Sequence, residues 1–198
     1  MKTELKKKLS ELRDFEDPRI SLEQYMTPPA LAADLVHAAY MRGDIDGREV
    51  VDLGAGTGML AIGAALAGGE VTAVEKDPEA VRLARENVED AGVEVELVEE
   101  DVEEFSGGYD TAVMNPPFSV HSDTGLSFWQ RAVEVADAVY GISPRGARSG
   151  IKDFVESSSH EIMGVEPYSI SLPPTYGFHT EEGRETEVDL IVSQRGDK

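Results

Sequence analysis

The chain has 198 residues, enough for one domain with a full two- or three-layer core. It has no cysteine, which excludes disulfides and thiolate metal sites. Asp and Glu number 39 against 18 Lys and Arg, which gives a net charge of −21 and a pI near 4.4. Metal-ligand spacing is also missing among the four histidines, His37, His121, His160 and His179.

The acids are spread along the chain and predict a solvated, densely carboxylated surface. Such a surface suits a halophile, because at molar salt a Debye length of about 3 Å screens the repulsion between carboxylates. An ordinary acidic protein is the alternative. The charge alone disfavours a nucleic-acid substrate, since phosphate contacts need Lys or Arg, but molar salt weakens that objection. No apolar run approaches the roughly 20 residues of a membrane span, so we expect a soluble, cytoplasmic protein.

The first 45 residues predict a helical extension whose apolar face must pack on another part of the chain. Thr27 is expected to cap its second helix, with Pro28 at the first helical position and the end near Arg42. The first helix is predicted from four apolar residues at helical spacing, Leu5, Leu9, Leu12 and Phe15.

From residue 48 onward, strands and helices alternate. The predicted strands cover residues 48–54, 70–77, 93–101, 109–115, 138–143, 161–173 and 186–194. The predicted helices cover residues 55–69, 78–92, 124–137 and 149–159. This alternation predicts a parallel sheet, and the last two strands should pair antiparallel because no helix separates them. We therefore expect an α/β fold in a single domain over residues 1–198: a doubly wound, seven-stranded Rossmann-like sheet.

Ligands of such sheets bind outside the carboxyl ends of the strands. The stretch VVDLGAGTGML places Asp52 and three glycines, Gly54, Gly56 and Gly58, at a strand-to-helix junction. Glycines allow the backbone to approach a ligand closely, and the helix N-terminus offers free N–H groups. The spacing lacks the third glycine position of the dinucleotide motif. Asp52 would repel a pyrophosphate but could meet an amino group; a tight turn is the alternative.

Two further acids end the next two strands. Glu75 stands 21 residues after Gly54, where a carboxylate can accept both hydroxyls of a ribose. Asp101 is placed to accept from an adenine amino group, and Val102 to lie along the ring. Each acid alone could be a surface residue. Together around a glycine loop they fit S-adenosylmethionine, an adenosine that carries an amino acid and no phosphate.

The stretch MNPPFS ends the fourth strand with Asn115, Pro116, Pro117 and Phe118. Proline fixes φ, removes an N–H and keeps the preceding residue extended. The Asn115 side-chain oxygen and the Pro116 carbonyl could accept both hydrogens of a planar –NH2 group, which would aim its lone pair at the cofactor methyl. Phe118 offers a stacking face for an unpaired or flipped base. No strong base is needed, because the methylated ammonium loses its proton to water.

The pair DLGAGTG and NPPF resembles the Class I S-adenosylmethionine-dependent amino-methyltransferases of the N6-adenine type. With LEQYMTP, AVYGIS, LPPTYGFH and EVDLI, the chain resembles the methyltransferase-like protein five family of small-subunit ribosomal RNA adenine-N6 methyltransferases and its archaeal relatives. The resemblance runs from about Leu12 to Val192. It implies formation of N6-methyladenosine in RNA.

The resemblance also implies that the N-terminal helical extension, residues 1–45, packs over the cofactor site. It further implies roles for individual residues. Thr57 stands where relatives can carry Cys, and Glu75 where many carry Asp, and both changes preserve the role. The catalytic motif would be Asn115, Pro116, Pro117 and Phe118. The cofactor would be held by Gln24, Thr27, Asp52, Gly54, Thr57, Met59, Glu75, Asp101, Val102 and Asn115.

Partners are implied in the same way. A basic stretch with Arg145, Arg148 and Lys152 is expected to contact RNA; an ordinary loop is the alternative. Family members pair with a small zinc-binding activator protein that adds a strand to a sheet edge. The alternating segment VEVELV, from Val93 to Val98, is the expected edge, unless its acids guard it. In the predicted hairpin at residues 175–185, His179 is expected to be structural.

Other functions use the same fold or site. A protein-glutamine N5 methyltransferase would bind the same –NH2 group, although those enzymes resemble NPPY and Phe118 favours a base. A DNA adenine methyltransferase would need a target-recognition domain for which this chain leaves little room. A non-catalytic RNA-binding assembly factor would not need the intact motif.

Overall fold

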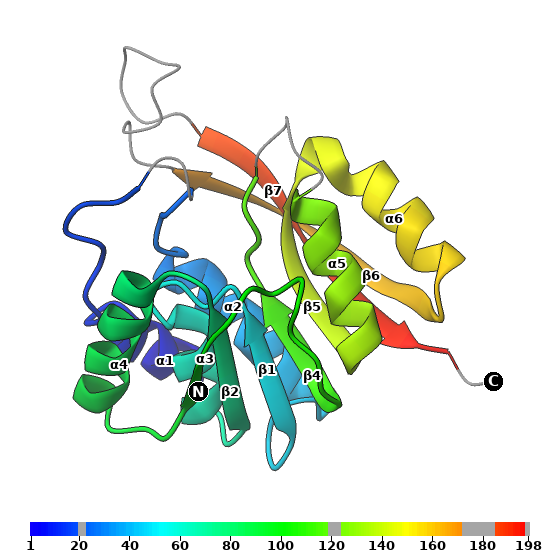
Figure 1. Ribbon diagram of the computed structural model, residues 1–198. Helices are drawn as coiled ribbons and strands as arrows, with labels where there is room; N and C mark the ends of the chain where they lie inside the picture. Colours follow the sequence, from blue (N-terminus) through cyan, green and yellow to red (C-terminus); the bar gives the residue numbers. More distant parts are fainter. Residues whose placement is uncertain (20–22, 119–123, 172–184, 197–198) are drawn as a thin grey trace.

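The computed structural model describes residues 1–19, 23–118, 124–171 and 185–196 (Figure 1). Its centre is a seven-stranded sheet in the order β3-β2-β1-β4-β5-β7-β6. The strands from β3 to β5 are parallel, and β7 runs antiparallel to both of its neighbours, β5 and β6. The predicted fold class and the antiparallel pairing of the last two strands are confirmed.

The elements follow the predicted alternation. The strands are β1 (Glu49–Leu53), β2 (Glu70–Glu75), β3 (Glu96–Glu99), β4 (Tyr109–Met114), β5 (Ala136–Pro144), β6 (His160–Ser171) and β7 (Glu185–Arg195). The helices are α1 (Lys2–Leu9), α2 (Pro29–Arg42), α3 (Met59–Leu66), α4 (Pro78–Ala91), α5 (Thr124–Val135) and α6 (Arg148–Ser157), with a 3-10 turn η2 (Arg145–Ala147) before α6. None of the described helices is long and apolar enough to span a bilayer.

Two apolar clusters form the core, one on each face of the sheet. Successive strand residues point to opposite faces, so Val50 joins the cluster beneath α1, α2 and α3, whereas Val51 joins the cluster beneath α5 and α6. The central strands are therefore apolar on both sides. The carboxyl ends of the parallel strands meet at one edge of this layer, beside the loop before α3 and residues 115–118 (Figure 1).

The N-terminal segment differs from its prediction in two places. Helix α1 ends at Leu9, so Leu12 packs on the core from beyond the helix. Helix α2 begins at Pro29, and its N-cap makes no side-chain hydrogen bond. The predicted capping role of Thr27 is therefore wrong. Its hydroxyl oxygen instead accepts a hydrogen bond from Asn115 Nδ2 at 2.9 Å, 88 residues away, and this tertiary partner outweighs the local capping preference.

The two ends of the sheet carry different edge strands. Strand β3 lies at one edge, as predicted, but it is shorter than the predicted strand, because Val93 and Val95 pack on the core before the ladder begins. Strand β6 forms the other edge and carries a register shift between Ile162 and Gly164 and a proline, Pro167. The predicted hairpin at residues 175–185 and His179 lie outside the described residues, apart from Glu185 at the start of β7.

Candidate active site

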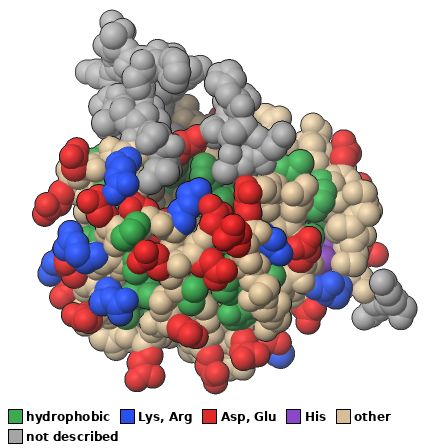
Figure 2. All heavy atoms as spheres, in the orientation of Figure 1, with side chains coloured by type: hydrophobic (Ala, Val, Ile, Leu, Met, Phe, Trp, Pro, Cys, Tyr) green, Lys and Arg blue, Asp and Glu red, His purple; other side chains and the backbone are tan. Residues whose placement is uncertain are grey.

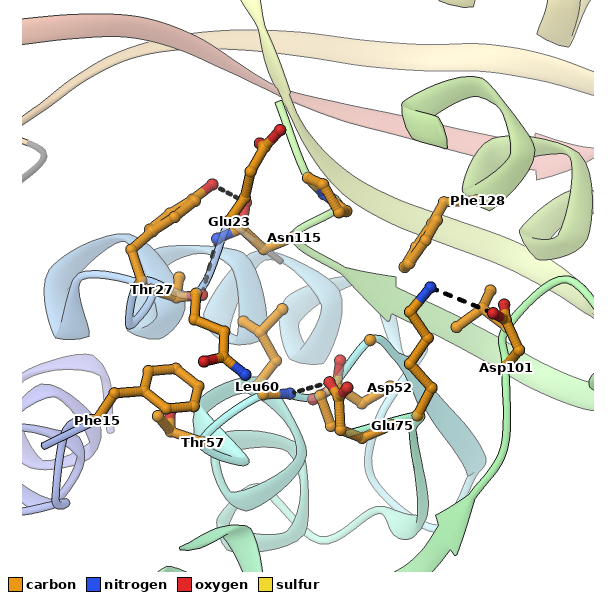
Figure 3. A pocket seen from close by; sticks show the side chains of 18 residues that line it. Phe15, Glu23, Thr27, Asp52, Thr57, Leu60, Glu75, Asp101, Asn115 and Phe128 are labelled. Atoms are coloured by element: carbon orange, nitrogen blue, oxygen red, sulfur yellow. Dashed lines mark hydrogen bonds and ion pairs between the residues drawn. The ribbon is translucent and has the colours of Figure 1, made fainter. Parts of the chain in front are cut away.

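A cavity of about 110 Å³, here called the first cavity, opens at the carboxyl ends of β1, β2 and β4 (Figure 3). Of the ten residues expected to hold the cofactor, nine line it: Gln24, Thr27, Asp52, Gly54, Thr57, Glu75, Asp101, Val102 and Asn115. The tenth, Met59, is the first residue of α3, and its side chain is buried in the core beneath α2 and α3. A role for Met59 in holding the cofactor stays a prediction, and its buried side chain leaves only the backbone to fill that role.

The glycine loop has the backbone that its sequence predicts. Gly54, Gly56 and Gly58 all have positive φ, with values of 76°, 54° and 84°. At Gly54 an added Cβ would lie 2.6 Å from Phe128 Cε1, so close packing also requires glycine there. The glycine loop therefore presents backbone atoms to the first cavity, and Phe128 of α5 packs directly against Gly54.

Asp52 lies at the floor of the first cavity and is only 1% exposed. Its Oδ2 accepts a hydrogen bond from the Ala61 N–H at 2.8 Å. Burial raises the pKa of Asp52 to about 7; the negative charge of Glu75 adds to this, and the Ala61 N–H opposes it. Near neutral pH this carboxyl group is thus poised between its two forms, and a cation bound beside it would favour ionisation.

Glu75 connects the glycine loop to α4. Its Oε2 accepts from the Gly56 N–H at 2.9 Å and its Oε1 from the Asp77 N–H at 3.0 Å. Both oxygens are therefore fixed in place and keep lone pairs for further donors. In Figure 3, Glu75 and Asp52 lie side by side on the cavity floor.

Asp101 stands at the opposite end of the cavity from Phe15, near Phe128 (Figure 3). Its Oδ1 accepts from the Glu103 N–H at 3.0 Å, and its Oδ2 from Lys76 Nζ at 3.2 Å. The Glu103 hydrogen bond, and then Lys76, lower the pKa of Asp101. Val102 is buried beside it. An ionised acceptor therefore stands next to an apolar wall.

Residues 23–27, which we call the strap, form one wall of the first cavity, which Glu23, Gln24, Tyr25 and Thr27 line. Gln24 Nε2 donates to Asp77 Oδ2 at 2.5 Å, which ties one end of the strap to the start of α4. At the other end, Asn115 Nδ2 donates to Thr27 Oγ1, and Tyr25 Oη donates to Asn115 Oδ1 at 3.2 Å. The Glu23 carboxylate accepts from the Phe118 N–H.

The predicted catalytic motif forms a wall between two cavities. Asn115 and Pro117 line the first cavity. Pro116, Pro117 and Phe118 line a second cavity of about 670 Å³, which is bounded by α5, the end of β5 and the start of α6. The motif thus faces the predicted cofactor site on one side and a larger, mostly apolar space on the other. Among the described residues, no cluster of three metal-ligating side chains occurs.

Seven lining residues were not singled out from the sequence as site residues. They are Phe15, Glu23, Tyr25, Ala55, Leu60, Lys76 and Phe128. Glu23 and Tyr25 lie within LEQYMTP, so that stretch was the signal that could have found them. No local pattern marks Phe128, which reaches the cavity from α5.

Two of the three residues predicted to contact RNA, Arg145 and Arg148, form ion pairs with acidic side chains of the same chain. Arg148 binds the fully buried Asp189 through Nε at 2.7 Å and Nη2 at 2.5 Å. Arg145 pairs with Glu187, and its Nε lies 3.5 Å from Asp189. These ion pairs offset the charge of both arginines. An RNA contact by Arg145, Arg148 and Lys152 stays a prediction.

Known proteins resemble this chain over most of its length. Residues 33–143 match the methyltransferase small domain family. The chain is 32% identical over 198 residues to the rRNA N(6)-adenosine-methyltransferase METTL5 of Danio rerio, across 95% of this chain and 96% of that protein. The crystal structure of PH1948 from Pyrococcus horikoshii has a TM-score of 0.90 and 36% identity, and covers 98% of this chain and 97% of its own.

A shorter resemblance concerns the glutamine alternative. The release factor glutamine methyltransferase of Deinococcus radiodurans is 44% identical, but over only 77 residues, which make up 37% of this chain and 28% of that protein. Such a match reflects a shared part of the fold and leaves most of the chain unmatched.

Proposed function

The chain belongs to the methyltransferase family that includes the METTL5 rRNA N6-adenosine methyltransferases, and we propose that it methylates N6 of an adenine in small-subunit ribosomal RNA. The observation that carries the proposal is the wall of residues 115–118 between the two cavities. The resemblance to glutamine methyltransferases is confined to part of the chain, which favours a base over a glutamine side chain as the target.

S-adenosylmethionine is the cofactor of this methyltransferase, and it supplies a methyl group on a sulfonium. The donor set of the first cavity fits it. Asp52 would meet the amino group, Glu75 the ribose hydroxyls and Asp101 the adenine amino group, with Val102 against the ring. Among the described lining residues Lys76 is the one cation, and it pairs with Asp101, so a phosphate-bearing ligand would lack a free cationic side chain there.

The reacting amine would enter from the second cavity. Asn115 Oδ1 and the Pro116 carbonyl would accept its two hydrogens, which draws the nitrogen lone pair out of conjugation with the ring. Pro117 keeps this edge rigid because its φ is fixed, and Phe118 would stack on the base. After transfer the nitrogen carries a positive charge and releases its proton to water.

An Asn115→Ala change tests this proposal. Methyl transfer from labelled cofactor to purified ribosomal subunits should fall by about 10²-fold or more at saturating cofactor, because the amine loses its main orienting acceptor. Calorimetry of cofactor binding checks that the first cavity is intact. The labelled nucleotide is then identified by mass spectrometry of the separated small and large ribosomal RNAs.

Three results would contradict the proposal. Label in protein and not in RNA would favour a glutamine methyltransferase. Cofactor binding without any labelling, in the presence of the activator protein, would favour a non-catalytic assembly factor. Label confined to large-subunit RNA would refute the choice of subunit.

We also propose that a small zinc-binding activator protein adds a strand to the sheet beside β3. The β3 edge is open and regular, whereas the β6 edge carries a register shift and Pro167, two features that block strand addition. The edge combines two half-buried apolar residues, Leu97 and Val98, with exposed acids on either side, Glu96 and Glu99. A partner strand that carries apolar residues and flanking basic residues would match this edge.

A further inference from the structure

The amide of Asn115 is held at both of its ends by hydroxyl groups of the strap. Nδ2 donates to Thr27 Oγ1 at 2.9 Å, and Oδ1 accepts from Tyr25 Oη at 3.2 Å. This matters because the terminal torsion of asparagine is broad and roughly two-fold. A half-turn would exchange the acceptor for a donor, which would repel an incoming –NH2 group.

The two hydroxyls differ in a way that favours one orientation. The lone pair of a phenol oxygen is delocalised into its ring, so Tyr25 is a better donor than acceptor. The aliphatic hydroxyl of Thr27 accepts readily. Tyr25 therefore favours the orientation in which it donates to Asn115 Oδ1, and Thr27 then accepts from Asn115 Nδ2. The second lone pair of Oδ1 stays available for a further donor.

The Tyr25 side chain also contacts Phe118, the residue of the motif that would stack on the base. The ring centroids of Tyr25 and Phe118 are 5.5 Å apart, with planes tilted by 52°, a favourable aromatic arrangement. The Phe118 N–H donates to the Glu23 carboxylate, so backbone and ring of Phe118 are both held by the strap. One tyrosine thus touches the two side chains that would bind the target base.

We propose that Tyr25 is a positioning residue for methyl transfer: its hydroxyl sets the orientation of the Asn115 amide, and its ring supports the Phe118 ring. This inference rests on the proposed function. Tyr25 acts through Asn115 and Phe118 and has no part in the bonds that change.

Two substitutions separate the two contacts. Tyr25→Phe removes the hydroxyl and keeps the ring, so it should lower kcat about fivefold to tenfold and leave the KM for RNA and the Kd for cofactor unchanged. Tyr25→Leu removes both, so the KM for RNA should also rise severalfold. Tyr40→Phe is the matched control, because Tyr40 lies on α2 and outside both cavities. It should change none of the three quantities: kcat, the KM for RNA and the Kd for cofactor.

A readout independent of turnover is the pair of side-chain NH2 signals of Asn115 in 15N-labelled protein, assigned by their loss in Asn115→Asp. Tyr25→Phe should shift both signals and speed their exchange with solvent, whereas Tyr40→Phe should leave them in place. Unchanged signals in Tyr25→Phe, or a kcat equal to that of the wild type, would overturn the inference.

The two proposals fail differently. If the wild type methylates no RNA, the proposed function fails, yet the NMR signals still decide whether Tyr25 orients Asn115. If the wild type methylates RNA and Tyr25→Phe is as fast, the role of Tyr25 alone is refuted. Thermal unfolding of each variant shows whether a loss reflects a damaged fold.

Discussion

At the scale of single residues, Asp52 connects the cofactor site to pH. Burial raises its pKa to about 7 in the folded chain, compared with about 3.9 for an unfolded Asp. Between these two values the folded state keeps a proton that the unfolded state has released, so this group makes the free energy of unfolding fall as pH rises from about 4 to 7. Above about 7 the contribution is constant.

Cofactor binding should show the opposite dependence. An amino group beside Asp52 favours the ionised form, so the affinity should increase from pH 5.5 to 7.5, by up to about tenfold per pH unit below the pKa. Calorimetric titration with S-adenosylmethionine measures this. Asp52→Asn is the control: it should bind more weakly at pH 7.5 and lose most of the slope. An equal slope in both proteins would show that another group titrates.

At the scale of elements, β3 is a four-residue strand with one bonded and one open side. The Glu100 N–H donates to the Glu75 carbonyl, toward β2. Because backbone groups alternate in direction along a parallel strand, Leu97 and Glu99 direct theirs to the open side. An added strand would bond there.

Glu99→Pro should abolish co-purification with the zinc-binding activator protein, since it removes an outward N–H and leaves the bonds of Val98 and Glu100 to β2. Glu99→Ala keeps that N–H and serves as the control. Affinity purification from co-expressing cells measures both. Retention of the activator by the proline variant, with an unchanged melting temperature, would place the partner elsewhere.

At the scale of the whole molecule, the excess of acids dominates the surface. Figure 2 shows Asp and Glu side chains scattered over the visible face, with fewer Lys and Arg between them. Each ion pair among the described residues joins one cation and one anion, so the pairs leave the net charge of −21 unchanged. Unscreened, this charge repels itself and opposes the compact state.

We propose that the protein is adapted to high salt. Its melting temperature at pH 7.5 should rise by several degrees between 0.1 and 3 M KCl, since each kcal/mol of added stability is worth about 2–4 °C in a chain of this size. At pH 5, nearer the pI, the rise should be smaller. Differential scanning calorimetry measures both series, and an unchanged melting temperature at pH 7.5 would refute the adaptation.

The alternation of strands and helices, the glycine loop and the three acids at or just after strand ends could be predicted from the sequence. These features are local: a strand, its turn and the residue that ends it are neighbours in the chain, and parallel strands bring such ends together. The ends of α4 were also predictable, because Pro78 stands at its first helical position and Gly92, with a φ of 66°, closes it. The cap is Asp77, which lies within the predicted strand at residues 70–77.

The contacts between the strap and the catalytic motif could not be predicted from the sequence, because they depend on tertiary packing. Tyr25 and Asn115 are 90 residues apart in sequence, and no pattern within either stretch specifies the other. For the same reason Thr27 was predicted as a helix cap when its partner is Asn115, 88 residues away. Local propensity describes what a residue can do near its neighbours; packing decides which partner it meets.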